Sequence, residues 1–301
     1  MEDFNKYPKH FYKYTPLDMN MIKGLINSEL WFSDPKTFND PFDCKIELDF
    51  NCTPEELKNY LDKINQYYSD VVKTINDPTI QIKYIRERYG NQISDKDCIN
   101  IIDRIYNKGG LLYTDIDKKI EVFVSNPEGL YTQLNNSAFS EVNKFRILSL
   151  SRINDSSTMW AHYANQHKGI CLELELEKDI PFFTFPLKVR YCKKYPRFNY
   201  IKEWGFENEF VMHIFRSKYS SWRYEEEYRI VKDTRETCFK NGGLLSINRS
   251  AIKKVFFGLK SSDSDIDLVK GINIKYFDNK LILYKAIEKP KSFNLGFIRI
   301  K

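Results

Sequence analysis

The sequence predicts an α+β fold, in which an antiparallel or mixed sheet forms the core of a single domain over residues 1–301 and residues 53–145 form a helical insertion. Short strand patterns occur before and after the insertion, without the regular intervening helices of a parallel α/β fold. Within the insertion, apolar residues recur at helical spacing. The 20 Tyr and 22 Phe residues supply the aromatic surface that a folded core requires.

The first fifty residues predict a strand, a helix, a second strand and a turn. Residues 10–15 and 30–33 are rich in aromatic and aliphatic side chains, as strands are. Residues 18–27 between them carry apolar side chains three or four positions apart, which indicates an amphipathic helix. The turn-forming residues 39–41 follow the second strand.

The insertion begins with a clear helix start. Thr53 can cap the helix, Pro54 suits its first position, and Glu56 can complete a capping box. Apolar residues then repeat every three or four positions through 57–75, so one face of this helix should be buried. A second helix is expected from Ser94, and the glycine pair 109–110 is expected to end it.

After the insertion the strand pattern returns. The expected strands are residues 146–151, 169–176, 187–192, 228–232, 253–259 and 281–286. Leu and Glu alternate in 171–176, which predicts a strand with one solvent-exposed face. Cys171 lies in an apolar run, which favours a buried thiol.

Composition narrows the classes of function. The net charge of +6 comes from 47 basic and 41 acidic residues that are mixed along the chain, which permits binding of nucleic acid or phosphate without requiring it. We expect a cytoplasmic protein, because no stretch has the length of a membrane span and the N-terminus lacks an export signal. The six scattered cysteines and four histidines do not predict a disulfide framework or a metal site.

The first of three polar and aromatic motifs is Asn39-Asp40-Pro41-Phe42. Its Asn and Asp can bond to nearby backbone while Pro sets a turn, so a structural role is one interpretation. The turn follows the predicted strand that ends at Ser33, so a role at the border of a cleft is the other.

The second motif is Met159-Trp160-Ala161-His162-Tyr163, expected on a short helix or loop before the strand at Gly169. For Trp160 a place in the core is favoured over a ligand platform. His162 could donate to a phosphate or transfer a proton, and a satisfied hydrogen bond within the core is the alternative.

The third motif runs from Trp222 to Arg229. A strand beginning near Tyr224 would place Glu225, Glu227 and Arg229 on one face. These residues could form a surface charge ladder. Alternatively, a carboxylate on a rigid strand could stabilise positive charge on a sugar carbon, and Glu227 is the first candidate for that role.

Together with Tyr12-Lys13-Tyr14, the three motifs resemble a bacterial family catalogued as a domain of unknown function. The family pattern is a tyrosine-bearing first strand, an Asn-Asp-Pro-Phe turn, a Met-Trp-x-His-Tyr segment followed by Gly, and a late Trp-x-Tyr-Glu-x-Glu-Tyr-Arg segment. The resemblance spans most of the chain outside the helical insertion.

A more distant resemblance is to the ADP-ribosyltransferases, because Lys13-Tyr14-Thr15, Trp31-Phe32-Ser33 and Glu225-x-Glu227 follow the order of that family's motifs. It implies a split sheet that grips NAD. It also implies that Glu227 holds a ribose hydroxyl and stabilises the oxocarbenium-like transition state, that Ser33 orients the ribose, and that Tyr14 or Trp160 flanks nicotinamide. Lys13 departs from the His or Arg usual in the first motif.

The resemblance implies an ADP-ribosyltransferase-like enzyme that uses NAD as its substrate, modifies a protein or nucleic acid, and acts as a bacterial toxin or phage-defence effector. The alternatives are a nuclease or phosphodiesterase built on Asp40, His162 and Glu227, and a noncatalytic sensor of a nucleotide or nucleic acid. The predicted catalytic residues are Glu227, Glu225 and His162. The predicted substrate-binding residues are Tyr14, Lys13, Ser33, Asn39, Asp40, Trp160, Tyr163 and Arg229.

Overall fold

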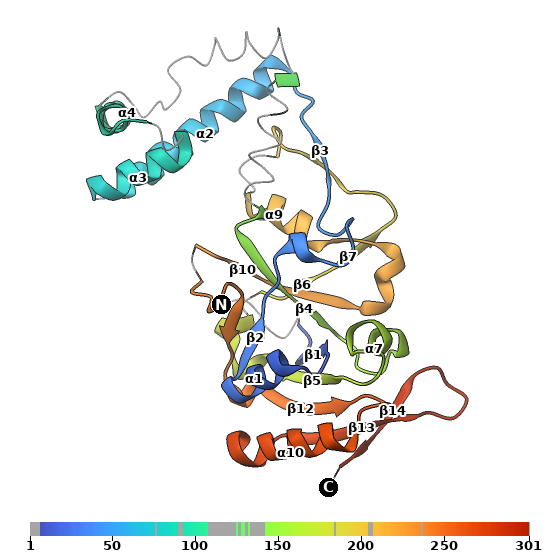
Figure 1. The fold of residues 1–301 in the computed structure, drawn as a ribbon. Coiled ribbons are helices and arrows are strands. Elements are labelled where there is room, and N and C mark those ends of the chain that lie inside the picture. The colour runs from blue at the N-terminus through green and yellow to red at the C-terminus, as the bar shows by residue number, and fades with distance from the viewer. Residues whose placement is uncertain are drawn as a thin grey trace. The chain divides into compact units, whose positions relative to one another are not determined.

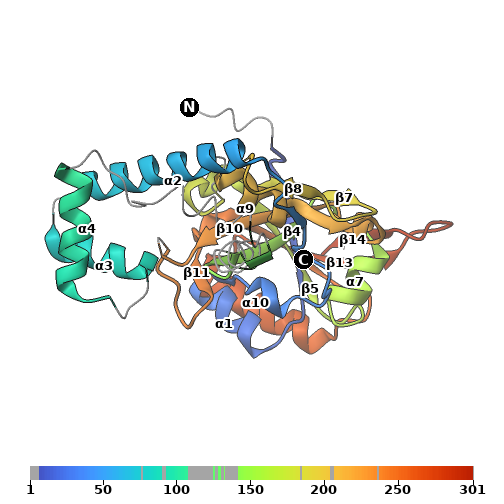
Figure 2. The ribbon, with the colours of Figure 1, turned by 90° about the horizontal axis from the view of Figure 1, so that it is seen from above.

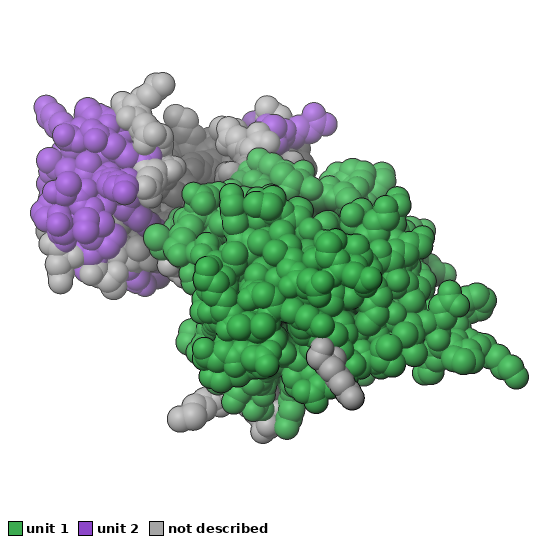
Figure 3. Space-filling view, turned by 60° about the horizontal axis from the view of Figure 1, so that its bottom comes forward, with its two compact units in different colours: residues 1–46, 139–196, 211–301 green, residues 47–138, 197–210 purple. Residues whose placement is uncertain are grey.

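The chain divides into two compact units, which Figure 3 distinguishes by colour. The computed structural model describes residues 7–75, 77–89, 93–107, 125, 128–129, 132, 142–183, 185–203, 207–235 and 237–300. Unit 1 comprises residues 1–46, 139–196 and 211–301, and unit 2 comprises residues 47–138 and 197–210. The expected insertion at 53–145 overlaps unit 2, which also includes a later segment of the chain. No helix within the described part of the chain is both long enough and apolar enough to span a membrane.

The described helices and strands confirm the α+β class (Figure 1). The α-helices are α1 (Met19–Asn27), α2 (Pro54–Thr74), α3 (Pro78–Tyr89), α4 (Asp95–Asn107), α7 (Ser157–Tyr163), α8 (Ile180–Phe183), α9 (Glu207–Arg216) and α10 (Asp263–Phe277). Short 3₁₀ helices are η2 (Pro35–Thr37), η3 (Leu176–Lys178), η4 (Ser220–Glu225) and η5 (Arg249–Ala251). The strands are β1 (His10–Thr15), β2 (Glu29–Trp31), β3 (Glu47–Asp49), β4 (Phe145–Ser151), β5 (Ile170–Glu175), β6 (Leu187–Lys188), β7 (Arg190–Cys192), β8 (Arg197–Asn199), β9 (Ser217–Tyr219), β10 (Glu227–Asp233), β11 (Leu244–Ser246), β12 (Ile252–Phe257), β13 (Ile282–Glu288) and β14 (Leu295–Arg299).

Unit 1 is built on an eight-stranded sheet in the order β14-β13-β12-β5-β1-β4-β10-β6. Its strand pairs are antiparallel except for β12 and β13, which run parallel, so the sheet is mixed, as the sequence predicts. The parallel pair is connected through α10, which lies along β12 and β13 (Figure 1).

The junction between β1 and β4 splits this sheet. β1 pairs with β5 along its full length, from His10 opposite Glu175 to Thr15 opposite Ile170. It pairs with β4 only where Tyr12 lies opposite Ser151. Beyond that residue pair, the backbones of β1 and β4 are not paired with each other. This leaves room between the two strands for side chains and for a pocket.

Each face of the sheet has its own apolar layer. Leu172 on β5 packs into a large cluster with side chains of α1 and α10, which lie side by side (Figure 2). Cys171, one position earlier, points to the opposite face and packs with Trp160 of α7. This alternation is the period-two pattern of a strand that is covered on both faces.

Glu173 corrects one sequence expectation. The Leu and Glu alternation in β5 predicted a solvent-exposed face, but Glu173 is only 2% exposed. Its carboxylate lies 2.9 Å from Lys254 Nζ on β12 and accepts a hydrogen bond from Tyr12 Oη at 3.1 Å. The neighbouring strands supply a cation and a hydroxyl, and these make burial of the carboxylate tolerable.

Residues 187–192 also differ from the expected single strand. They form β6, which pairs with β10, and β7, which pairs with β9 in a separate small sheet. Val189 lies between them, and its backbone N–H donates to Glu227 O at 3.0 Å.

Unit 2 contains α2, α3, α4 and the parallel pair of β3 and β8. The predicted capping box is present, since Thr53 N–H donates to Glu56 Oε2 at 2.8 Å and Glu56 N–H donates to Thr53 Oγ1 at 3.2 Å. Leu57 and Ile64 are buried on the predicted face of α2. The predicted helix end at residues 109–110 lies outside the described residues.

Candidate functional site

A pocket of about 300 Å³ lies in unit 1, where β1 and β4 separate. Its lining residues are Tyr12, Lys13, Tyr14, Ser33, Thr37, Phe38, Asn39, Asp43, Ser149, Leu150, Ser151, Met159, Tyr163, Lys218, Glu225 and Glu227. All three motifs contribute, so segments that are far apart in the sequence meet at one cavity. Its volume lies at the lower end of the range of small-molecule sites.

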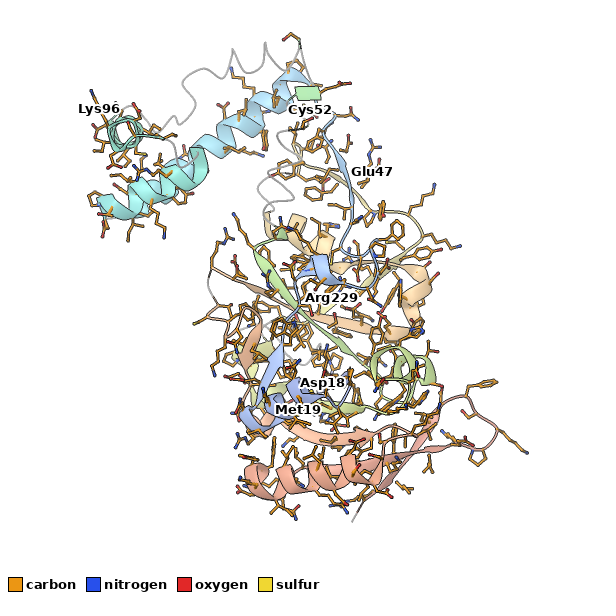
Figure 4. The ribbon with its side chains drawn as sticks, viewed as in Figure 1. Asp18, Met19, Glu47, Cys52, Lys96 and Arg229 are labelled. Carbon is orange, nitrogen blue, oxygen red and sulfur yellow. The ribbon has the colours of Figure 1, made fainter. Side chains whose placement is uncertain are left out.

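Behind the pocket, Arg229 is completely buried on β10 (Figure 4). Its Nε donates to Glu227 Oε1 at 2.8 Å, and its Nη2 donates to Glu227 Oε2 at 3.0 Å and to both carboxylate oxygens of Asp43, at 2.9 and 2.7 Å. Nη1 donates to Phe215 O at 3.1 Å. A guanidinium can be buried when its donors are satisfied in this way.

Lys218 on β9 is the second buried cation of this cluster. Its Nζ donates to Glu227 Oε2 at 2.9 Å and to Glu225 Oε2, and it lies 3.5 Å from Asp43 Oδ2. The ammonium also lies 5.2 Å from the centre of the Trp222 ring. Burial alone would lower the pKa of Lys218, but the surrounding carboxylates outweigh it and raise the pKa, so the ammonium stays charged.

The two glutamates have pKa values shifted in opposite directions. Burial raises the pKa of Glu225, and the negative charge of Glu227 adds to this, while Lys218 opposes it. Burial acts on Glu227 in the same direction, but Arg229 and Lys218 outweigh it and hold the pKa of Glu227 well below its usual range. Two neighbouring carboxyl groups whose pKa values are shifted apart in this way are typical of acid–base catalysis.

The backbone conformation that brings Glu225 and Glu227 together differs from the one that the sequence predicts. A continuous strand from Tyr224 was expected, but Glu225 ends the 3₁₀ helix η4 and the strand begins at Glu227. Between them, Glu226 has the left-handed φ of 42°, which breaks the strand geometry. The carbonyl of Glu225 is held by Ser151 Oγ at 2.6 Å, so β4 sets the position of the turn.

The turn at residues 39–44 supplies another part of the cluster. Asp40 Oδ1 accepts the Phe42 N–H at 2.8 Å, which gives Asp40 a turn-forming role. The turn positions Asp43, whose Oδ1 accepts the Cys44 N–H at 2.7 Å while both of its oxygens accept from Arg229. Asn39, in the same motif, lines the pocket.

Helix α7 contributes Met159 and Tyr163 to the pocket and other residues to its support. Tyr163 Oη donates to Glu225 Oε1 at 2.5 Å. Trp160 is fully buried, donates from Nε1 to Asn154 O at 2.7 Å and packs edge-on against Tyr14. The Nδ1 of His162 is 2.9 Å from Tyr224 Oη, on the exposed side of the helix.

A steric constraint explains why glycine follows the second motif at position 169. A Cβ on Gly169 would lie 2.4 Å from the carbonyl oxygen of Thr15 on β1. Asn165, Gln166 and His167 just before it all have positive φ angles, so the chain makes a left-handed turn between α7 and β5. The turn needs glycine where the backbone meets β1.

The structure thus separates the predicted residues into three groups. Those that line the pocket are Tyr14, Lys13, Ser33, Asn39, Tyr163, Glu225 and Glu227. Arg229 lies behind Glu227, while Asp40, Trp160 and His162 do not line the pocket. Of the residues of the nuclease alternative, only Glu227 lines it. Within the described ranges, no cluster of three or more His, Cys, Asp or Glu is arranged to hold a metal ion.

Asp43 and Lys218 were not among the predicted residues. Asp43 directly follows the first motif. An acidic residue next to a predicted turn could have been recognised as a candidate site residue from the sequence. Lys218 lies in the polar segment Arg216-Ser217-Lys218, and its burial follows from the fold of β9 beside β7.

The fold and the pocket define a mixed α+β protein with three carboxylates, those of Asp43, Glu225 and Glu227, on the wall of a cavity in a split sheet. The model of a family described as "Protein of unknown function (DUF2971)" matches residues 159–230. That stretch contains the whole second and third motifs, so the match supports kinship with a domain-of-unknown-function family over this part of the chain. No curated protein and no solved structure matches the chain.

Proposed function

We propose that this protein is an ADP-ribosyltransferase-like enzyme that breaks the N-glycosidic bond of NAD and transfers ADP-ribose to a macromolecule. The observation that carries the proposal is the pair of carboxylates, Glu225 and Glu227, which share Lys218 on the wall of one pocket and have opposite pKa shifts. Cleavage at a sugar carbon builds up positive charge there and transfer to the acceptor releases a proton, so two carboxyl groups with different roles suit this reaction.

In this proposal Glu227 is the permanently ionised group. Its negative charge, held in place by Arg229 and Lys218, stabilises the oxocarbenium-like transition state by an electrostatic interaction that needs no rearrangement. Both of its oxygens already accept hydrogen bonds. Glu227 therefore acts on the sugar mainly through its charge.

Glu225 is the group that handles the proton. The bond from C1′ to the nicotinamide nitrogen breaks, and its electron pair neutralises the pyridinium ring. A lone pair of the acceptor forms the new bond to C1′, and the acceptor's proton passes to Glu225. A raised pKa suits this base, because the ideal value lies near the working pH.

The pocket walls suit a sugar ring. Ser33, Asn39 and Lys13 supply hydroxyl, amide and amine groups that can orient the ribose. Tyr14 remains the candidate to flank nicotinamide, and Trp160 supports it from the core, with its ring edge-on at 5.4 Å.

The test is incubation of the purified protein with labelled NAD and a cell lysate. We expect free nicotinamide and labelled macromolecules to accumulate together. Glu225→Gln should abolish both products while the variant stays folded. If wild type yields neither product with lysates from several bacteria, the pocket serves another function and the proposal fails.

The resemblance also suggests a biological setting, a bacterial toxin or phage-defence effector, and this part of the proposal has its own test. Expression of the wild-type protein in bacteria should lower cellular NAD and stop growth, whereas Glu225→Gln should allow growth at the same protein level. Equal growth and equal NAD in both strains, with and without phage infection, would contradict this setting.

A further inference from the structure

Lys13 is a lysine of the pocket that no carboxylate of the described residues contacts directly. Its Nζ donates to the carbonyl oxygen of Ser149 at 3.0 Å, across the split between β1 and β4. Among the described residues, no carboxylate oxygen lies within 4.0 Å of Lys13 Nζ, whereas Lys218 in the same pocket contacts three acids. The two pocket lysines therefore have different chemistry.

The surroundings of Lys13 make its amine easier to deprotonate. Burial lowers the pKa of Lys13, and the charge of Glu227 opposes this without cancelling it. A lysine amine that has lost its proton is a nucleophile, and enzymes that use such an amine keep it desolvated in an enclosed pocket.

The rest of the lining indicates which electrophile the pocket would accept. Hydroxyl and amide groups come from Ser33, Thr37, Asn39 and Ser151, and they suit a compound that carries several hydroxyls. Glu225, on the same pocket, can give and take a proton because its pKa is raised.

We propose that Lys13 Nζ traps the carbonyl carbon of an open-chain sugar as an imine. The amine nitrogen bonds to the carbonyl carbon while the carbonyl oxygen takes a proton from Glu225. The nitrogen then loses its proton to Glu225, the carbon–oxygen bond breaks, and the oxygen leaves as water with a second proton from that carboxyl group. These steps leave a protonated imine beside the Glu225 carboxylate, and return of that proton to Glu225 completes the conversion of amine and aldehyde into imine and water, with no oxidant or reductant needed. This activity does not depend on NAD cleavage.

The test is reductive trapping with ribose 5-phosphate and cyanoborohydride, in which hydride from the reagent converts the imine into a stable secondary amine. Peptide mass spectrometry then gives the rate of modification at each lysine. We expect Lys13 to react several-fold faster than the exposed Lys280, because burial lowers the pKa of the Lys13 amine and so raises its neutral fraction. Equal or slower modification of Lys13 would overturn the proposal.

Lys13→Arg is the matched control, because it keeps a long basic side chain and cannot form an imine. In this variant the fast modification should disappear while the slow background at Lys280 stays the same. If fast labelling persists elsewhere in the pocket, the assignment to Lys13 is wrong. Thermal denaturation of both proteins shows that they are compared in the folded state.

Nicotinamide release from NAD, measured on the same wild-type sample, separates this inference from the proposed function. Trapping at Lys13 without nicotinamide release overturns only the transferase proposal. Nicotinamide release without selective trapping overturns only the imine proposal.

Discussion

Arg229 holds Glu227 with two hydrogen bonds, from Nε to Oε1 at 2.8 Å and from Nη2 to Oε2 at 3.0 Å, and both side chains are buried. Two residues on one strand thus form a charged pair, in which Glu227 lines the pocket and Arg229 lies behind it. The pair keeps the Glu227 carboxylate ionised and oriented. It also makes the carboxylate part of the folded structure, because removing one partner leaves the other charge buried and unpaired.

The first prediction concerns the stability of Glu227→Gln. The change leaves Arg229 and Lys218 without one of their anions, so the free energy of unfolding should fall by about 3–5 kcal/mol. Urea denaturation followed by circular dichroism measures it. Glu226→Gln is the control: Glu226 is exposed and 3.7 Å from Arg152, and its loss should cost less than about 1 kcal/mol. Equal stability of the two variants would show that the buried pair is not important for folding.

The second prediction is energetic coupling between Asp43 and Arg229. Asp43→Asn and Arg229→Met should each destabilise the protein, and the double variant should be less destabilised than the sum of the two by about 0.5–3 kcal/mol. The reason is that each single change leaves the other buried charge without one of its partners, whereas the double change removes both charges of this pair. Chemical denaturation of the four proteins gives this coupling. Strict additivity would mean that the hydrogen bonds at 2.9 and 2.7 Å contribute no mutual stabilisation.

The third prediction is a pH dependence due to Glu225. Its pKa is raised in the folded protein, so its contribution to stability is present below the ordinary carboxyl pKa and is lost as the pH rises through the raised value. Glu227 behaves oppositely, since its lowered pKa gives a contribution that is present above the ordinary carboxyl pKa and is lost as the pH falls from there through the lowered value. Because the two carboxyl groups interact, they titrate as a pair.

Glu225→Gln resembles the protonated form at every pH. Its free energy of unfolding relative to the wild type should therefore increase as the pH rises from about 4 toward 8, a range that starts near the ordinary Glu pKa of about 4.3. Denaturation curves across this range measure the difference. A difference that stays constant with pH would mean that the pKa of Glu225 is the same in the folded and unfolded states.

Local sequence patterns predicted much of the fold. Strand β1, helix α1, and helix α2 with its capping box follow from apolar spacing and capping residues that act over a few positions. The burial of Glu173 could not be predicted in this way, because Lys254 reaches it from a strand about eighty positions later. The single pairing between β1 and β4, which makes room for the pocket, is likewise a tertiary feature.

The candidate site was only partly predictable, because local sequence patterns do not show which residues meet in the fold. The motifs identified Glu225, Glu227 and Tyr163, whose residue types and neighbours were unusual. They did not distinguish the residues that line the pocket from Trp160 and Asp40, which support its walls, because all five lie in motifs of similar composition. Lys218 lies outside these motifs, and only its contacts with three acidic residues in the folded protein identify it as part of the site.

The fourth prediction concerns His162, which the sequence placed among the catalytic residues. His162→Ala removes the contact with Tyr224 Oη and should lower the free energy of unfolding by about 1 kcal/mol. Tyr224→Phe removes the same hydrogen bond and should cost a similar amount. Neither residue lines the pocket, so nicotinamide release should change little. A large loss of rate with unchanged stability would assign His162 to the reaction.

The most direct test of the central claim is the rate of nicotinamide release from NAD by wild type, Glu225→Gln and Glu226→Gln, with each variant first shown to be folded. The two glutamates are adjacent in sequence, but only Glu225 lines the pocket. Loss of a proton-transferring group should lower the rate by about 100-fold or more in Glu225→Gln, whereas Glu226→Gln should match the wild type. Equal rates in all three proteins, or no release by the wild type, would contradict the account.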